Sequence, residues 1–301
     1  MEELELLKRQ IVIARELQGL VRVMKTLSAS RVREYDQAVA SIEEYGRTVA
    51  SGLQVAMRNR PRNISRRPPG QSRVGAIVVG SDQGLCGNFN ERIAQFTVEK
   101  FSELGVAPQA RALVVVGERP ANHLEAAGQV LEDRLSFTGD HGATTRVILR
   151  VLEKIEEWDL RRRMDRIVLF YNAPAEGAAF EPEMQNLLPL DIEWLDELAN
   201  RTWPSRCIPT YSGDWEALFA GLVKQHIFYT VYRAFIESVA SENTSRLRAM
   251  QAAQKNIDER LEDLHSKFNR VHQSAVTSEL LDITTGFQAI TGEDSSTSHL
   301  N

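Results

Sequence analysis

The segment Gly80–Asn90, GSDQGLCGNFN, contains the residue types best suited to chemistry in this chain. Cys86 lies between glycines, as a nucleophile does in a sharp strand-to-helix turn, but a catalytic cysteine needs a histidine base. His123 and His141 are the only histidines in the same part of the chain, and nothing in the sequence orders them. The segment lacks the Gly-Lys-Ser/Thr ending of a phosphate-binding loop and the glycine spacing of a dinucleotide-binding loop.

A structural role explains the same segment more simply. The glycines would let the backbone turn tightly, the polar side chains would cap the turn, and the cysteine would be a small buried residue. The residues expected to build this structural loop are Asp82, Gly84, Cys86, Gly87 and Asn90. The cysteine-dependent hydrolase remains an alternative that replacing Cys86 would test.

Composition narrows the function further. The formal net charge is −5, which disfavours a nucleic-acid-binding protein, and the RRR at 161–163 is expected to be a solvated helix end. The two cysteines are far apart and the six histidines form no ligand-spaced cluster, so we expect no metal site and no cofactor. The charged N-terminus is unlike a signal peptide, and no apolar run approaches 18 residues, so no segment is expected to span a bilayer.

The positions of the prolines define the elements that flank this segment. All ten prolines lie between Pro61 and Pro209, so both ends of the chain are free to form long helices. Apolar residues recur at three- and four-residue steps through both ends, as in a coiled coil. In the N-terminal end, the expected seam includes Leu4, Leu7, Ile11, Ala14, Leu17, Leu20, Met24 and Leu27.

The middle of the chain alternates between strand and helix patterns. The runs 75–80, 112–117 and 166–171 are short, β-branched and continuous, which predicts parallel strands buried on both faces. Helical patterns fall near residues 90–104, 120–127 and 144–158. We therefore expect an α/β fold combined with a long antiparallel coiled coil, in which the N- and C-terminal helices pair into a rod and a Rossmann-like α/β domain is inserted between them.

This organisation gives five expected parts. They are an N-terminal coiled-coil helix (1–57), an arginine-rich linker (58–73), the α/β domain (74–209), a C-terminal coiled-coil helix (210–290) and a polar tail (291–301). The linker carries Arg58, Arg60, Arg62, Arg66, Arg67 and Arg73 with no acidic residue among them. It is either a solvated loop or a contact with an acidic partner or membrane surface.

Four stretches of the chain carry a family resemblance. They are MKTLSASRVREY (Met24–Tyr35), GSDQGLCGNFN (Gly80–Asn90), ASENTSRLRAMQAAQKN (Ala240–Asn256) and FNRVHQSAVTSELLDITTG (Phe268–Gly286). They resemble four sequence motifs of the gamma subunit of F-type ATP synthases, and they occur in the same order along the chain. The chain departs from the family pattern at Gln83, Asn88, Leu247 and Ser278. In these departures it resembles a divergent member of the family, or one from an alternative or sodium-translocating operon.

The resemblance implies a rotary shaft without catalytic residues. Its coiled coil would turn inside a hexamer of alpha and beta subunits, and its foot would dock with the epsilon subunit on a membrane ring of c subunits. It would thus couple rotation of the ion-carrying ring to the catalytic beta subunits, as a peripheral protein on the cytoplasmic face of a bacterial inner membrane. Met24 and Lys25 match the pair that faces the lever loop of a beta subunit, and Arg246, Gln273 and Thr277 match residues that contact the alpha/beta collar.

A scaffold is the alternative from another class. A coiled-coil spacer that presents an α/β binding domain would explain the helices, but not the four ordered motifs. Co-purification with ATPase subunits separates the two hypotheses.

Overall fold

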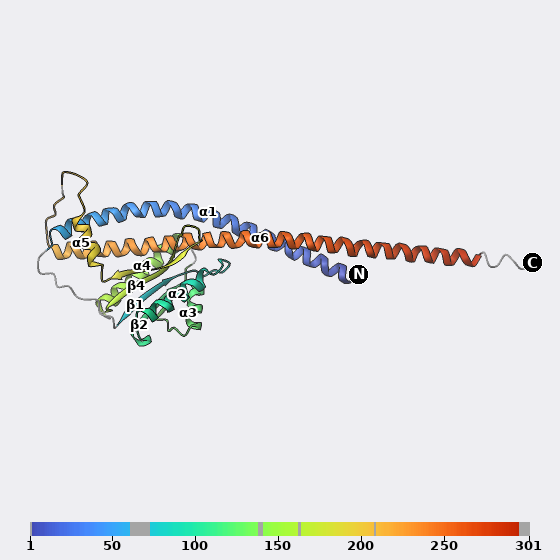
Figure 1. Ribbon diagram of the computed structural model, residues 1–301, viewed down its shortest axis with the longest axis horizontal. Helices are drawn as coiled ribbons and strands as arrows, with labels where there is room; N and C mark the ends of the chain where they lie inside the picture. Colours follow the sequence, from blue (N-terminus) through green and yellow to red (C-terminus); the bar gives the residue numbers. More distant parts are fainter. Residues whose placement is uncertain (1, 61–72, 138–140, 162–163, 208, 295–301) are drawn as a thin grey trace, which may run out of the picture. The chain divides into compact units, whose positions relative to one another are not determined.

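The structure is a computed structural model that describes residues 2–60, 73–137, 141–161, 164–207 and 209–294 (Figure 1). The remaining residues include most of the expected arginine-rich linker and the end of the polar tail, which therefore lie outside the described residues. The chain divides into two compact units. The first contains Met1–Thr26 and Met250–Asn301, and the second contains Leu27–Ala249.

Two long helices begin and end the described chain. Helix α1 spans Glu2–Arg58 and helix α6 spans Trp215–Asp294, so each expected helix is one continuous element. Acidic residues occupy the first turn of α1, where they interact favourably with the helix dipole. The carboxylate of Asp214 accepts a hydrogen bond from the Ala217 backbone N–H at 2.9 Å, which satisfies one free donor at the start of α6.

In the first unit, the two helices pair through a narrow apolar seam. Ile11 and Ala14 of α1 pack with Leu261 and Leu264 of α6. Polar pairs border the seam, in which Arg15 meets His265 at 3.2 Å, Gln18 donates to Asp258 at 2.5 Å and Lys25 donates to Gln254 at 3.1 Å. Since residue numbers rise along α1 as they fall along α6, the pairing is antiparallel, as expected.

The second unit contains a five-stranded sheet in the order β3-β2-β1-β4-β5. Strands β1, β2, β3 and β4 are parallel, and β5 runs antiparallel to β4 at one edge. The strands are β1 (Val74–Val79), β2 (Arg111–Val116), β3 (Asp133–Leu135), β4 (Arg166–Ala173) and β5 (Glu181–Leu188). The helices between them are α2 (Phe89–Glu103), the 3-10 turn η1 (Pro108–Ala110), α3 (Glu118–Ala126), α4 (His141–Leu160) and α5 (Ile192–Asn200).

Alternating strand residues divide the core of this unit between the two faces of the sheet. On one face, Ile77, Val114 and Leu169 pack with α4 and α6. On the other face, Val78 and Val115 pack with α2 and α3. Figure 1 shows the resulting three layers, with α2 and α3 on one side of the sheet and α4 and the helix pair on the other. Since β1 is buried along its whole length, its sequence is apolar throughout rather than alternating.

The seam of α1 differs from the expected one in its middle part. One row of buried positions recurs every seven residues, at Ala14, Val21, Ser28, Tyr35, Ile42, Val49 and Ala56, and Ile11, Gly46 and the rest of 53–57 are buried as well. The prediction that Leu17, Leu20 and Leu27 continue the seam was wrong, since these side chains are 48%, 53% and 59% exposed. The strict seven-residue step places Gln18 and Lys25 beside α6 instead, where each finds a polar partner.

Three short elements were not predicted. Strand β3 has three residues, β5 reads EPEMQNLL and includes a proline, and α5 has nine residues. Edge strands of this kind lack the continuous apolar run of a central strand, which explains why β5 was missed.

Candidate functional site

The loop that follows β1 is anchored in the α/β domain by Asp82. One carboxylate oxygen accepts from the Glu118 backbone N–H at 2.9 Å. The other accepts from the Ser136 hydroxyl and the Phe137 backbone N–H, both at 2.7 Å. Asp82 therefore joins the loop to the start of α3 and to the chain that leaves β3.

Asn90, at the start of α2, closes the same loop from the other end. Its side-chain oxygen accepts from the Ser81 backbone N–H at 3.0 Å. Its amide nitrogen donates to the Ser81 hydroxyl at 2.9 Å and to the Cys86 sulfur at 3.4 Å. The polar residues of this segment thus bond the loop to itself, which is the arrangement a structural turn requires.

Cys86 lies in an environment that disfavours its reactive form. Its side chain is only 1% exposed, and burial, with a further contribution from the carboxylate of Glu242, raises the pKa of the thiol. A nucleophilic cysteine needs the thiolate, so this position opposes the hydrolase alternative. His123 is exposed on α3, and the side chain of His141 lies outside the described residues.

The tip of the loop uses left-handed backbone at two positions. Gly87 has φ +60°, which glycine adopts without steric cost, and Leu85 has φ +62°, which is unfavourable for a branched side chain. Gly84 lies between the two anchors and faces the guanidinium of Arg119. At Leu85, the tip is therefore held in a conformation that this residue does not prefer.

Helix α6 covers the inner side of the loop with polar residues. The Ser245 hydroxyl donates to the Cys86 carbonyl at 2.7 Å. Arg246 Nη2 donates to the Glu242 carboxylate at 2.6 Å, to the Gly84 carbonyl at 3.3 Å and to the Gln83 carbonyl at 3.5 Å. Burial raises the pKa of Glu242, and the neighbouring Arg246 opposes that rise.

This position of Arg246 differs from the surface position that a collar contact requires. The Arg246 side chain is 5% exposed and that of Glu242 is 9% exposed. In the free chain, the guanidinium is occupied by its own helix and by the loop. The carboxylate of Glu242 and the hydroxyl of Ser245 were not among the expected site residues.

The other expected contact residues lie in the first unit. Met24 and Lys25 are half-buried on α1, and Lys25 donates to Gln254 of α6. Gln273 and Thr277 are exposed on α6, where the Thr277 hydroxyl donates to the Gln273 carbonyl at 2.8 Å. These four side chains are thus at least partly accessible.

The described part of the arginine-rich segment contacts α5. Arg58 donates to the carbonyls of Ala199 and Arg201 at 3.0 and 2.6 Å. Arg60 forms an ion pair with Asp196 at 2.6 Å. These two arginines hold the end of α1 against α5, while the positions from 61 to 72 lie outside the described residues.

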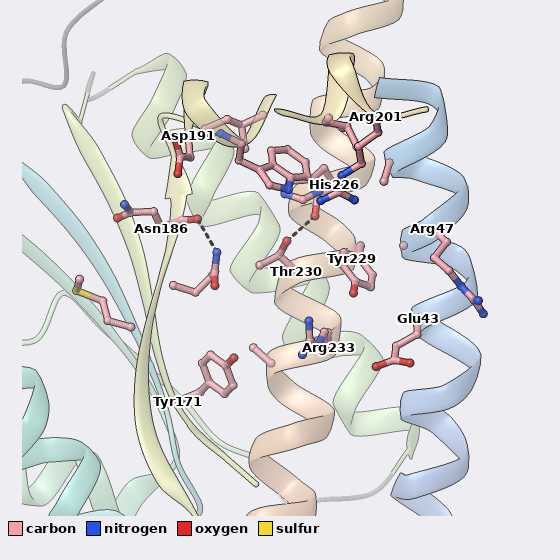
Figure 2. Close-up of a pocket in the computed structure, with 18 residues that line it drawn as sticks. Glu43, Arg47, Tyr171, Asn186, Asp191, Arg201, His226, Tyr229, Thr230 and Arg233 are labelled. Atoms are coloured by element: carbon pink, nitrogen blue, oxygen red, sulfur yellow. Dashed lines mark hydrogen bonds between the residues drawn. The ribbon is translucent and has the colours of Figure 1, made fainter. Parts of the chain in front are cut away.

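A cleft of about 750 Å³ lies in the second unit between α1, α6, α5 and the edge strand β5. Figure 2 shows α6 in its centre, the strand that carries Asn186 on one side, and α1 with Glu43 and Arg47 on the other. His226 of α6 stacks on Trp194 of α5, with 4.7 Å between the ring centroids. No sequence pattern indicates this cleft, because its walls come from four separated segments.

The titratable groups of the cleft are not poised for acid–base chemistry. Burial raises the pKa of Tyr171, and Glu237 and Glu183 raise it further, so the phenol keeps its proton and donates to Glu183 at 2.9 Å. Burial lowers the pKa of His226, which therefore stays neutral at pH 7. The hydroxyl of Thr230 is committed to the His226 carbonyl at 2.9 Å. A general base beside a free nucleophile is therefore not found among these groups.

The described residues also contain neither a metal-ligand cluster nor a membrane-spanning helix. No three histidine, cysteine or carboxylate side chains among them are grouped as a metal site would require. Over the same residues, none of the helices has a stretch that is both long and apolar enough to cross a bilayer.

Comparison with known sequences shows similarity over nearly the whole chain. A family model described as ATP synthase matches residues 3–290. The ATP synthase gamma chain of Sulfurovum sp. (strain NBC37-1) is 27% identical, and the match covers 96% of this chain and 100% of the relative. The ATP synthase gamma chain of Anaeromyxobacter sp. (strain K) is 29% identical over the same shares.

Comparison with solved structures shows a shared fold. A chain of the Euglena gracilis mitochondrial ATP synthase, solved as OSCP/F1/c-ring in rotational state 3, matches with a TM-score of 0.65 at 15% identity. That match covers 97% of this chain and 96% of the other. A chain of the rotor from the same organism matches with a TM-score of 0.62 at 13% identity, over 91% of this chain and 99% of the other.

Proposed function

The chain belongs to the ATP synthase gamma chain family, and from that premise we propose that it is the central-stalk rotor subunit of an F-type ATP synthase or ATPase. It is a non-catalytic subunit that couples rotation of a membrane ring to conformational cycling of the catalytic beta subunits. The observation that carries this proposal is the family match over residues 3–290, which includes both long helices and the loop after β1.

The proposed partners follow from this role. The alpha and beta subunits surround the helix pair, and the epsilon subunit and the ring of c subunits meet the foot of the stalk. The protein is a peripheral part of the membrane-bound complex, and we assign it to the cytoplasmic face of a bacterial inner membrane. The relatives named above are bacterial gamma chains, which supports that assignment.

Four residues of the first unit are the proposed contacts with the catalytic hexamer. Met24 and Lys25 face the lever loop of a beta subunit, and Gln273 and Thr277 contact the alpha/beta collar. Their accessibility in the free chain supports these roles. Arg246 would reach a collar only by leaving Glu242, so its contact with the collar would require α6 and the loop to separate.

Charge changes at the lever-loop contact test the proposal. In the assembled complex, Met24→Lys or Lys25→Glu should lower the ratio of ion pumping to ATP hydrolysis by about threefold or more, because the first places a charge in an apolar contact and the second reverses the charge of a polar contact. Proton pumping in membrane vesicles, measured beside ATP hydrolysis, gives this ratio. Thermal unfolding of the free chain should change little, since neither side chain belongs to a buried cluster.

Lys100→Glu is the matched control, since it reverses a lysine charge on α2 of the α/β domain. It should leave the ratio unchanged. Equal pumping ratios in the wild type and in both lever-loop variants would contradict the assigned contact. Failure of the chain to co-purify with alpha and beta subunits would contradict the proposed function as a whole.

A further inference from the structure

The polar stretch of α6 from Ser241 to Arg246 is buried, although it interrupts an apolar helix face. Ser241, Glu242, Asn243, Ser245 and Arg246 are all at most 7% exposed. Burying an ion pair costs solvation free energy that a well-packed apolar pair would not cost. These residues are therefore poorly explained by stability alone.

Two side chains of this stretch reach the loop, whereas Asn243 and Thr244 bond to carbonyls of α6 itself. Ser245 donates to the carbonyl of Cys86, and Arg246 donates to the carbonyls of Gln83 and Gly84. The Arg246 Nε and the Ser241 hydroxyl have no hydrogen-bond partner. The side chains of this stretch therefore contact the loop although some of their own buried polar atoms stay without hydrogen bonds.

The loop needs such an external support. Its two ends are held inside the α/β domain by Asp82 and Asn90, but its tip contains Leu85 in the left-handed region with an exposed side chain. A strained tip persists only when its surroundings determine its conformation. Within the loop, the Ser81 hydroxyl donates to the Gln83 carbonyl at 2.9 Å. From outside the loop, donors on α6 reach carbonyls on both sides of Leu85.

We propose that Arg246, held in position by Glu242, is a latch that closes the loop 83–86 on α6 within the second unit. Arg246 is a positioning residue, since it acts on the loop through its guanidinium donors and not on any substrate. The latch is a local device. Breaking it opens the loop and leaves the sheet folded.

The thiol of Cys86 reports whether the latch is closed, because this residue belongs to the loop and its side chain is buried. Cys207, the other free cysteine, is exposed and can be removed as Cys207→Ser. In that background, the rate of Cys86 modification by a small thiol reagent measures how often the loop opens. The experiment uses the full-length chain, without denaturant and in low urea.

Arg246→Gln should raise the rate of Cys86 modification by about tenfold or more, because charge-assisted hydrogen bonds to the loop are lost. Arg246→Lys keeps the charge but loses the fork of donors, so it should raise the rate less than Arg246→Gln does. Glu242→Gln should also raise the rate, since it frees the guanidinium from its fixed position. Because Glu242 and Arg246 also act on the pKa of the Cys86 thiol, the pH dependence of modification is measured for each variant and the rates are compared per thiolate. The rate in these variants should depend little on urea, as expected for a local opening.

Arg248→Gln is the matched control on the same helix. Arg248 donates to the Ala178 carbonyl at 3.0 Å and does not reach the loop, so its replacement should leave the rate within about twofold of the wild type. Equal rates for Arg246→Gln and Arg248→Gln would overturn the latch. An increase that appears only in proportion to urea-induced unfolding would overturn it as well.

The milder variants keep the test decisive if Arg246→Gln does not fold. In that case, Glu242→Gln and Arg246→Lys must both exceed Arg248→Gln in rate, and a failure of that order rejects the proposal. The thiol measurement does not involve other subunits, so its outcome is independent of the proposed rotor function.

Discussion

Helices α1 and α6 pair in both units, but the two units cover them differently. In the second unit, α6 lies against α4 and the sheet, so Val231, Phe235 and Val239 are almost fully buried. Among the described residues of the first unit, the same two helices pack only against each other, and Leu264 is the most buried of their apolar residues at 2% exposed. The same pair of helices is therefore packed against more of the protein in the second unit than in the first.

This difference explains which unit can present apolar surface. A two-helix seam is about two residues wide, so the remaining apolar positions stay exposed. Leu17, Leu20 and Val23 of α1 and Leu280 and Leu281 of α6 are all exposed in the free chain. Leu17, Leu20 and Val23 lie within two turns of α1, and Leu280 and Leu281 are neighbours further along α6, so these are two separate groups of exposed apolar residues.

Removing one large core side chain from each unit should give the largest effects. Trp158 of α4 is fully buried under the sheet, so Trp158→Ala should lower the free energy of unfolding of the second unit by about 3–5 kcal/mol. Leu264→Ala should cost the first unit about 2–3 kcal/mol. Urea unfolding combined with hydrogen exchange of backbone amides measures both losses.

The location of the loss is the informative result. Leu264→Ala should weaken amide protection in residues 2–26 and 250–285 and leave the amides of the sheet unchanged. If either substitution weakened protection equally throughout the chain, the two units would unfold as one and the comparison would fail.

One pair of glycines on α1 should give effects of opposite sign. A Cβ atom at Gly46 would overlap the ring of Tyr229, whereas Gly19 has open space around it. Gly46→Ala should therefore lower the free energy of unfolding by about 1–3 kcal/mol. Gly19→Ala should raise helix stability by about 0.5–1 kcal/mol, since alanine loses less entropy on folding.

Thermal unfolding of the two glycine variants, followed by circular dichroism, measures the difference. A shift of the same sign for both would mean that the close approach of Tyr229 to α1 is absent in solution.

The smallest effect concerns the corrected seam. Leu20→Ser should change the free energy of unfolding of the free chain by less than about 0.5 kcal/mol, because the side chain is exposed. The neighbouring Val21→Ser should cost about 1–3 kcal/mol, because the Val21 side chain is only 8% exposed. Comparable losses for the two variants would restore the seam that includes Leu20.

Local signals in the sequence determined most of the architecture. The absence of proline before Pro61 and after Pro209 allowed two long helices, and three β-branched runs predicted β1, β2 and β4 within about one residue at their starts. These signals work because helix and buried strand impose their own periodicities on side chains. The three- and four-residue spacing also predicted that the chain ends pair, but it could not choose between Leu20 and Val21.

For the loop 80–90 and the polar stretch of α6, local signals again predicted one part and the tertiary structure decided the other. The sequence indicated a tight structural turn at 80–90 because glycines and side-chain caps act locally. It placed Arg246 on a helix surface, and only the tertiary structure brought Arg246, Glu242 and the loop carbonyls together. The cleft beside β5 was likewise invisible. Contacts between residues more than 150 positions apart depend on how the layers pack, and that packing leaves no periodic mark in either segment alone.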